Sequence, residues 1–216
     1  MQHSTYCVEL LLKSCGEKVG IFSKNRNKYK KLRKLGYIIG EHTYVGKHTG
    51  LCAPDKIKIG DYCCIANNVF FNPSTHPTNW LSTHPFQFRR KLDARLYGNF
   101  PENPNPLDFN EVPKNIEIVN DVWVAEHTFI MGGVKIGDGA IIGMNAVVTK
   151  DIPPYAIAVG VPAKVVKYRF SPEIIEKLLE LKWWSLPYDF ILTLPFNDIN
   201  ACISKIEEYR QNSSLA

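Results

Sequence analysis

The chain has 216 residues, of which 45% are hydrophobic and 22% charged, and its formal net charge is +5. This composition is that of an ordinary globular protein and excludes the fibrous and intrinsically disordered classes. No apolar run approaches the roughly 20 residues that cross a bilayer, and the apolar patch at residues 8–12 is too short for the core of a signal peptide. We therefore expect a cytoplasmic protein.

The first segment in chain order, residues 1–38, is expected to be a mixed or helical extension. From Lys24 to Lys34 it carries seven basic residues and no acidic one. Such a run is usually a solvated helix face, but it also suits an anionic partner such as a membrane surface, an acidic glycan or cofactor phosphates. Because no nucleic-acid-binding motif accompanies it, we set nucleic acid aside and keep peripheral membrane contact as one use of this segment.

The next region, residues 39–168, carries a large apolar side chain at every sixth position. These positions are Ile39, Val45, Leu51, Ile59, Ile65, Phe71, Ile118, Val124, Ile130, Ile136, Ile142 and Val148. A helix needs a spacing near 3.6 and a flat strand needs strict alternation, so neither explains a period of six. The period fits a coil whose units are one short strand and one corner, and stacked coils pair as parallel sheets around a buried core.

Smaller residues accompany this repeat. Two positions before the later repeat residues stand Ile116, Val122, Thr128, Val134, Ala140 and Ala146, and Cys63 takes the same inward place in an earlier run. The two earlier runs are out of step around Pro54 and Asp55, where we expect a small insertion at a corner. The sequence therefore predicts an all-β-dominated fold, a parallel β-helix, for residues 39–168.

Residues 72–115 interrupt the period and are rich in proline, asparagine and aromatic residues. A long irregular segment in a compact domain is usually functional, so we expect an excursion loop that leaves the coil and returns to it. Residues 169–216 are expected to be helical. A first helix should begin at Ser171 and Pro172, which are favoured at the N-cap and the first turn, and a last helix should run from 198 to 210.

Two other kinds of site are disfavoured by residue spacing. Residues 40–49 do not form a phosphate-binding loop, because five residues separate Gly40 from Gly46 and a histidine follows Lys47. The six histidines show no zinc-binding spacing, so we expect no metal. The six cysteines form no C-x-x-C pair and are expected to be reduced thiols.

His76 is the candidate catalytic base. It lies in the excursion, in the segment N-P-S-T-H-P-T-N-W that ends at Trp80. The alternative is a structural histidine bonded to a backbone carbonyl, and on residue type alone this alternative is the commoner one. His84, eight residues further on, is the competing candidate for the base.

Three stretches resemble the hexapeptide-repeat acyltransferases, and within them the xenobiotic acetyltransferases of the type B chloramphenicol and streptogramin kind. The first is H-x-x-N-W-L-S-T-x-P-F, from His76 to Phe86. The second is N-D-V-W-V at 120–124, followed by G-V-K-I-G-D-G at 133–139. The third runs from V-T-K-D-I-P-P-Y-A at 148–156 through G-V-P-A-K at 160–164 to W-W at 183–184. Together they extend the resemblance over residues 57–192.

The resemblance implies a left-handed β-helix and a homotrimer whose active sites lie at the subunit interfaces, with acetyl-CoA as the acyl donor in the groove between neighbours. It places the catalytic base on His76, with Asn79, Trp80 and His84 near the acceptor. The residues that it implies along acetyl-CoA are Trp123, Ala125 and Glu126 at the thioester end, Ala140, Gly143, Ala158 and Gly160 beside pantetheine and adenine, and Lys164 and Arg169 at the phosphates.

These residue types fit acyl transfer. An imidazole with an unperturbed pKa of about 6.5 can take the proton of an acceptor hydroxyl as its oxygen attacks a thioester. A backbone N–H near Glu126 could stabilise the oxyanion that forms. Because no acyl-enzyme is needed, no cysteine has to act as a nucleophile.

Three functions stay open at this point. An O-acetyltransferase acting on a sugar hydroxyl, in polysaccharide biosynthesis, is favoured because residues 40–58 are plain repeat where drug-modifying relatives have a longer tyrosine-rich stretch. A chloramphenicol or streptogramin O-acetyltransferase is supported by the stretch from His76 to Phe86. A non-catalytic scaffold is disfavoured by His76 and by the segment around Trp123. The chain departs from the family's pattern at two places. Ala125-Glu126, at the thioester end of the donor, stands where relatives usually have Gly-Ser, and Asn79, near the acceptor, stands where the chloramphenicol enzymes carry Asp.

Overall fold

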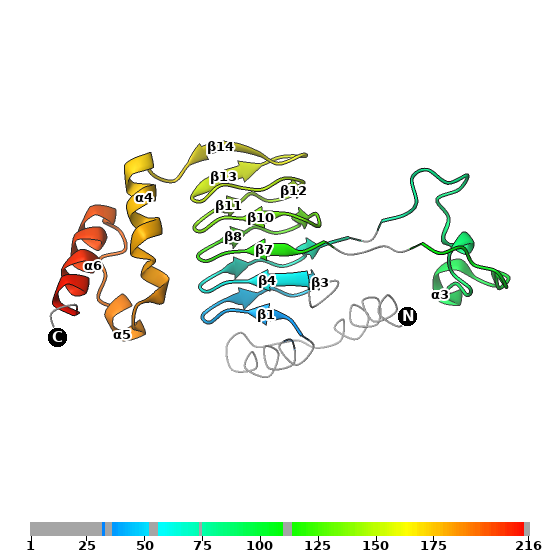
Figure 1. Ribbon diagram of the computed structural model, residues 1–216, viewed down its shortest axis with the longest axis horizontal. Coiled ribbons are helices and arrows are strands. Elements are labelled where there is room, and N and C mark those ends of the chain that lie inside the picture. Colours follow the sequence, from blue (N-terminus) through cyan, green and yellow to red (C-terminus); the bar gives the residue numbers. More distant parts are fainter. Residues whose placement is uncertain (1–31, 33–35, 52–55, 74, 110–113, 214–216) are drawn as a thin grey trace.

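Short strands of the repeat region lie side by side in three sheets (Figure 1). The computed structural model describes residue 32 and residues 36–51, 56–73, 75–109 and 114–213. The first sheet contains β1 (Ile38–Ile39), β4 (Ile57–Ile59), β7 (Ile116–Ile118) and β10 (Lys135–Ile136). The second contains β2 (Tyr44–Val45), β5 (Cys64–Ile65), β8 (Trp123–Val124), β11 (Ile141–Ile142), β13 (Ala156–Val159) and β14 (Lys164–Tyr168). The third contains β3 (Gly50–Leu51), β6 (Phe70–Phe71), β9 (Phe129–Ile130) and β12 (Val147–Val148).

The chain visits the three sheets in rotation. Strands β1, β2 and β3 lie in the first, second and third sheets, and β4, β5 and β6 repeat this order one level further along the stack. Neighbouring strands pair in parallel with equivalent repeat positions opposite each other, as Ile65 with Val124 and Val124 with Ile142. The chain therefore forms a three-sided coil, and the predicted period of six corresponds to one strand and one corner.

The inward repeat positions fill the core of the coil. The later repeat residues are at most 1% exposed: Ile118, Val124, Ile130, Ile136, Ile142 and Val148. Full burial of such side chains stabilises the fold by about 1.5–3 kcal/mol each. Thr128 is also buried, and its hydroxyl donates to the carbonyl of Ala125 at 2.8 Å, which compensates for the loss of water. Cys63 occupies the inward place predicted for it, and burial raises the pKa of its thiol to about 12.

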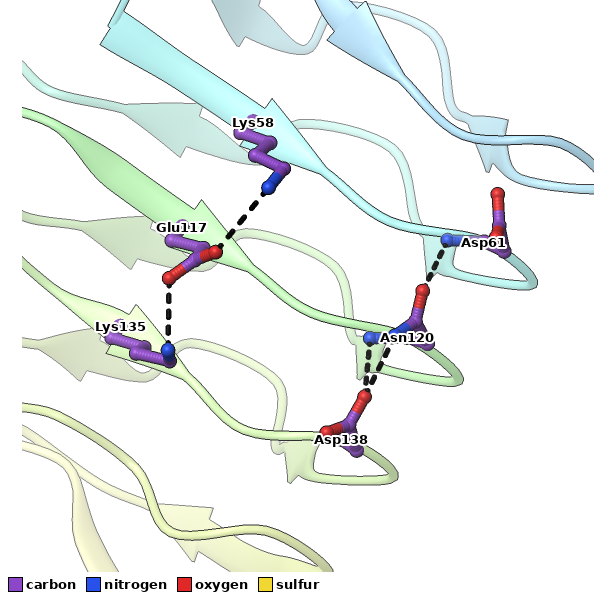
Figure 2. Close-up of polar contacts among 6 residues, drawn as sticks. All are labelled: Lys58, Asp61, Glu117, Asn120, Lys135 and Asp138. Carbon is purple, nitrogen blue, oxygen red and sulfur yellow. Dashed lines mark hydrogen bonds and ion pairs between the residues drawn. The ribbon is translucent and has the colours of Figure 1, made fainter. Parts of the chain in front are cut away.

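A ladder of side chains joins successive coils where the chain passes from the first sheet to the second, which we call the first corner (Figure 2). The backbone N–H of Glu41 donates to Asp61 at 2.7 Å, that of Asp61 to Asn120 at 2.9 Å, and that of Asn120 to Asp138 at 3.0 Å. Each side chain thus caps the N–H at the same corner position of the preceding coil. We call this arrangement the corner ladder.

The outer face of the first sheet is charged. Glu117 pairs with Lys135 at 3.0 Å and with Lys58 at 3.6 Å, as Figure 2 shows. The two ammonium groups, Lys135 foremost, lower the pKa of the Glu117 carboxyl. These side chains are well exposed, so the column adds little stability and mainly keeps this face solvated.

The excursion between β6 and β7 projects away from the stack of coils (Figure 1). It contains a 3-10 turn, η3 (Pro85–Gln87), and a short helix, α3 (Ala94–Tyr97). Its turns are held together by hydrogen bonds of its own, including those from Asn103 N to Arg90 O and from Leu107 N to Gln87 O, both 2.8 Å.

Helices follow the coil on the side away from the excursion (Figure 1). They are α4 (Pro172–Leu181), α5 (Tyr188–Ile191) and α6 (Ile199–Ser213), with a 3-10 turn, η4 (Trp183–Ser185), between the first two. Their apolar side chains pack around Tyr155 of the coil. The predicted start at Ser171 and Pro172 is confirmed, although the Ser171 side chain makes no capping hydrogen bond. The last helix starts one residue later and ends three residues later than predicted.

One strand pairing differs from the parallel arrangement predicted through residue 168. Strand β14 pairs antiparallel with β13, with Ala156 opposite Tyr168. Gly160 adopts a φ of +98° in the connection, and the chain reverses there instead of making another coil.

Some expectations lie outside the described residues. They include the corner insertion at Pro54 and Asp55 and the basic segment from Lys24 to Lys34, of which only Leu32 is described. Within the described ranges, no helix has the length and apolar character needed to cross a membrane.

Candidate active site

His76 has one ring nitrogen tied to the backbone. Its Nδ1 lies 2.5 Å from the carbonyl oxygen of Thr83. A carbonyl oxygen can only accept, so Nδ1 carries the proton in this contact and Nε2 keeps its lone pair. The ring is exposed, which leaves Nε2 accessible to a hydroxyl group. This contact leaves Nε2 as the ring nitrogen that can accept a proton, which is the state that a general base needs.

Aromatic side chains hold the His76 ring in place. Phe88 meets it edge-on, with ring centroids 6.0 Å apart and an interplanar angle of 83°. Phe88 in turn packs against Trp80 at 6.2 Å and Phe109 at 4.9 Å. Trp80, predicted to contact the acceptor, therefore also packs against the side chain that holds the His76 ring. Asn79, which precedes it in the chain, is exposed.

His84, the competing candidate, has the opposite arrangement of protons. Its Nδ1 accepts the backbone N–H of Phe86 at 3.2 Å and caps η3. With Nδ1 accepting, the proton of the neutral ring lies on Nε2, which then cannot accept another. The ring also packs among Phe86, Tyr97 and Phe100. His84 is therefore built into the excursion and is poorly suited to act as a base.

The residues predicted at the thioester lie on the coil. Trp123, on the outer face of the second sheet, is 49% exposed. Ala125 and Glu126 follow it at the passage from the second to the third sheet, which we call the second corner. Glu126 accepts the Asn67 side-chain amide at 2.9 Å, while its own backbone N–H has no hydrogen-bond partner in the described part of the chain. This N–H is available as a donor to a ligand.

The prediction that two alanines border acetyl-CoA needs correction. The side chains of Ala140 and Ala158 are fully buried, because they occupy inward positions of the repeat. Neither residue exposes any of its surface to a ligand on this subunit. Gly143 lies at the second corner against Val159, and Gly160 is in the chain reversal before β14. Lys164 is exposed on β14.

Arg169, predicted to meet cofactor phosphates, has partners within the subunit. Its Nη1 donates to the Asp121 carboxylate at 3.1 Å and to the Gly139 carbonyl at 2.7 Å. The guanidinium also lies over the ring of Tyr155. Burial raises the pKa of Asp121, and the Arg169 charge opposes that shift. Arg169 therefore serves to join the first corner to the C-terminal segment.

The residues of the predicted site lie on two different parts of the subunit, the excursion and the coil. His76 belongs to the excursion, which points away from the coils that carry Trp123 and Glu126 (Figure 1). Among the described residues there is also no group of three or more His, Cys, Asp or Glu side chains arranged to hold a metal.

The outward positions of the repeat carry a signal that the sequence analysis did not use. On the second sheet, the aligned outward residues of the five parallel strands are apolar or weakly polar: Tyr44, Cys64, Trp123, Ile141 and Ile157. The column ends at a charged residue, Lys167 of the antiparallel strand β14, which lies opposite Ile157. The equivalent column on the third sheet is Gly50, Phe70, Phe129 and Val147. Two faces of the coil are thus apolar, and the first sheet alone has a charged column.

Comparison with known proteins agrees with the repeat. The family described as "Bacterial transferase hexapeptide (six repeats)" matches residues 115–150, and "Hexapeptide repeat of succinyl-transferase" matches residues 36–72. A chloramphenicol acetyltransferase from Morganella morganii is 40% identical over 142 residues, which are 64% of either chain. A probable macrolide acetyltransferase from Lysinibacillus sphaericus is 42% identical over 135 residues, 61% of this chain and 70% of that protein.

A galactoside O-acetyltransferase from Escherichia coli (strain K12) is more distant, at 32% identity over 129 residues, 60% of this chain and 52% of that protein. The chain spans less than two thirds of the length of the chloramphenicol acetyltransferases that it matches, at 64%, 61% and 60%. The repeat matches and the macrolide acetyltransferase relative together show that the chain belongs to the hexapeptide-repeat acyltransferases, in their xenobiotic acetyltransferase subgroup.

Proposed function

We propose that the protein is an acetyl-CoA-dependent O-acetyltransferase in which His76 is the general base. The observation that carries this proposal is the Nδ1 contact with the Thr83 carbonyl, which leaves Nε2 as the accepting nitrogen. Several relatives of the chain are named acetyltransferases, which supports acetyl transfer as the reaction class.

The reaction transfers one proton in two steps, from the acceptor hydroxyl to His76 and from His76 to the CoA thiolate. As the acceptor oxygen attacks the carbonyl carbon of the acetyl group, its proton passes to Nε2 of His76 and the new C–O bond forms. The carbonyl electron pair moves onto oxygen and returns as the C–S bond breaks. The CoA thiolate leaves and takes the proton from Nε2, so the imidazole ends neutral. General base catalysis of this kind contributes a factor of about 10²–10⁴.

The backbone N–H of Glu126 is the proposed donor to the developing oxyanion. No existing hydrogen bond has to break before this N–H can donate, because no group in the described part of the chain accepts from it. Trp123 and Ala125 would flank the acetyl group, with Gly143, Gly160 and Lys164 further along the donor. A donor of this kind contributes about 10²–10³ in kcat.

We further propose a homotrimer of left-handed coils with the active site between neighbours. Apolar columns on the second and third sheets leave two faces that water solvates poorly, and packing the second sheet of one subunit against the third sheet of the next would cover both. The same assembly would let the excursion of one subunit carry His76 to the coil of another.

For the acceptor we propose a sugar hydroxyl, with an antibiotic hydroxyl as the second candidate. The plain repeat at residues 40–58, without a tyrosine-rich insertion, favours the sugar, and a galactoside O-acetyltransferase is among the relatives. The second candidate is favoured by two relatives of higher identity, which are named a chloramphenicol acetyltransferase and a probable macrolide acetyltransferase. A cytoplasmic location fits both candidates and remains a prediction.

CoA release from acetyl-CoA, measured with galactosides, oligosaccharides, chloramphenicol, a streptogramin and a macrolide, tests the function and separates the two acceptors. We expect turnover with a glycan and none with the antibiotics. Turnover with an antibiotic and with no glycan would show that the acceptor is an antibiotic hydroxyl. Failure to turn over any hydroxyl acceptor would contradict O-acetyl transfer.

A matched pair of variants tests the base. His76→Asn keeps an N–H for the Thr83 carbonyl but removes Nε2, so kcat should fall by about 10²–10⁴. His84→Asn keeps an acceptor at the cap of η3, where asparagine is favoured, so kcat should stay within a few-fold of wild type. Equal losses in both variants would show that the excursion merely needs intact packing, and full turnover by His76→Asn would remove His76 from the mechanism.

A further inference from the structure

The corner ladder follows one rule at the first corner. A side-chain oxygen of Asp61, Asn120 or Asp138 lies 2.7–3.0 Å from the backbone N–H at the same position of the preceding coil. Because the coils stack in register, this geometry is repeated wherever an aspartate or asparagine stands at that position. A corner N–H is therefore capped when the next coil supplies such a residue.

The second corner follows the rule only at its first step. The equivalent positions in successive coils are Lys47, Asn67, Glu126 and Met144. Asn67 caps the N–H of Lys47 at 2.8 Å, as the rule requires. The longer Glu126 side chain accepts the side-chain amide of Asn67 instead, at 2.9 Å.

Met144 breaks the ladder at the next step. Its thioether is at best a weak hydrogen-bond acceptor, its side chain is 61% exposed, and the N–H of Glu126 beneath it has no partner among the residues described. An asparagine or aspartate at 144 would place an oxygen 2.7–3.0 Å from this N–H, by analogy with the other steps. An oxyanion donor must lie about 2.7–3.1 Å from the oxygen that it stabilises. A capping oxygen and the acetyl carbonyl oxygen would therefore compete for the same place.

We propose that Met144 is a positioning residue, which keeps the N–H of Glu126 uncapped and so leaves it free for the acetyl carbonyl oxygen. This inference rests on the proposed acetyl transfer. The side chain of Met144 need not touch the reacting atoms, because its role is to withhold a hydrogen-bond acceptor from the ladder.

Met144→Asn and Met144→Asp test the proposal, with Met144→Leu as the matched control. Met144→Asn should complete the ladder, lower kcat by about 10²–10³ with little change in KM for the acceptor, and raise the melting temperature by about 2–4 °C. Met144→Leu, which also lacks an acceptor, should keep wild-type kcat. A crystal structure of Met144→Asn should show its side-chain oxygen within hydrogen-bond distance of Glu126 N.

Two results would overturn the proposal. One is wild-type kcat in a Met144→Asn protein whose crystal structure shows the cap formed, and the other is a structure in which the asparagine leaves Glu126 N uncapped. A wild-type protein that acetylates no hydroxyl acceptor would contradict the proposed function instead, and the melting temperatures and the crystal structure would still decide whether residue 144 closes the ladder.

Discussion

His76 and His84 show how a hydrogen-bond partner decides the chemistry of a residue. Both belong to the same stretch of the excursion and both use Nδ1, but His76 faces a carbonyl oxygen and His84 faces a backbone N–H. The structural alternative for His76, a bond to a backbone carbonyl, is present in the molecule. It does not exclude the catalytic role, because that bond fixes the tautomer in which Nε2 can accept a proton.

A proline at position 126 tests the proposed oxyanion donor at the residue scale. Glu126→Pro removes the N–H. A proline is already present at the equivalent position of the first corner, Pro154, and both positions precede a residue with positive φ, Tyr155 and His127 respectively. We therefore expect the corner to tolerate the change while kcat falls by about 10²–10³.

Glu126→Ala serves as the control for this prediction, since it keeps the N–H and loses only the carboxylate. Its kcat should stay within a few-fold of wild type, with steady-state CoA release as the measurement for both variants. A proline variant as active as the alanine variant would show that another group stabilises the oxyanion.

At the scale of the element, the corner ladder gives each coil a specific link to the next. Asn120 both accepts the N–H of Asp61 and donates its amide to Asp138 at 2.9 Å. Asn120→Ala should therefore lower the free energy of unfolding by about 1–2 kcal/mol, since each hydrogen bond contributes about 0.5–1.5 kcal/mol net. Urea unfolding at fixed protein concentration measures the change.

Asn197→Ala is a suitable control for the ladder, because Asn197 is exposed and lies outside the coil. Its effect should stay within about 0.5 kcal/mol. If both asparagine variants unfolded at the same urea concentration as wild type, the ladder would be a consequence of coil stacking and contribute nothing to it.

The repeat was enough to predict the strands, because a period of six leaves a single set of inward positions. The residues that it placed inward, such as Ile118 and Cys63, are buried. The same pattern places Ala140 inward, so the repeat predicts its burial, whereas the family resemblance puts it beside acetyl-CoA. The ladder could not be predicted, because it joins residues as distant as Asp61 and Asn120, whose register depends on where the chain re-enters the coil after the excursion.

The site was less predictable than the fold. Motif resemblance selected His76 over His84, but the tautomer that distinguishes them depends on Thr83 and on the turn at Pro85. The reversal into β14 was missed because no periodic signal marks where coiling stops. The pairing of Arg169 with Asp121 could not be predicted, because the two residues lie 48 positions apart in the chain.

At the scale of the whole molecule, we propose that the site is shared between two subunits. The excursion points away from its own coil (Figure 1). The parallel strands of the second and third sheets carry apolar or weakly polar residues on their outer faces. If the base comes from one subunit and the oxyanion donor from the next, defects in the two groups should complement each other when they are carried by different subunits.

Mixed trimers of His76→Asn and Glu126→Pro subunits, isolated with two different affinity tags, test this composite site most directly. Trimers made of a single variant should show the reduced kcat predicted above for that variant. A mixed trimer has one interface that pairs an intact His76 with an intact Glu126 N–H, so we predict that it recovers about one third of the wild-type rate of CoA release. Mixed assemblies as inactive as their parents would place the base and the donor in the same subunit and contradict the composite site.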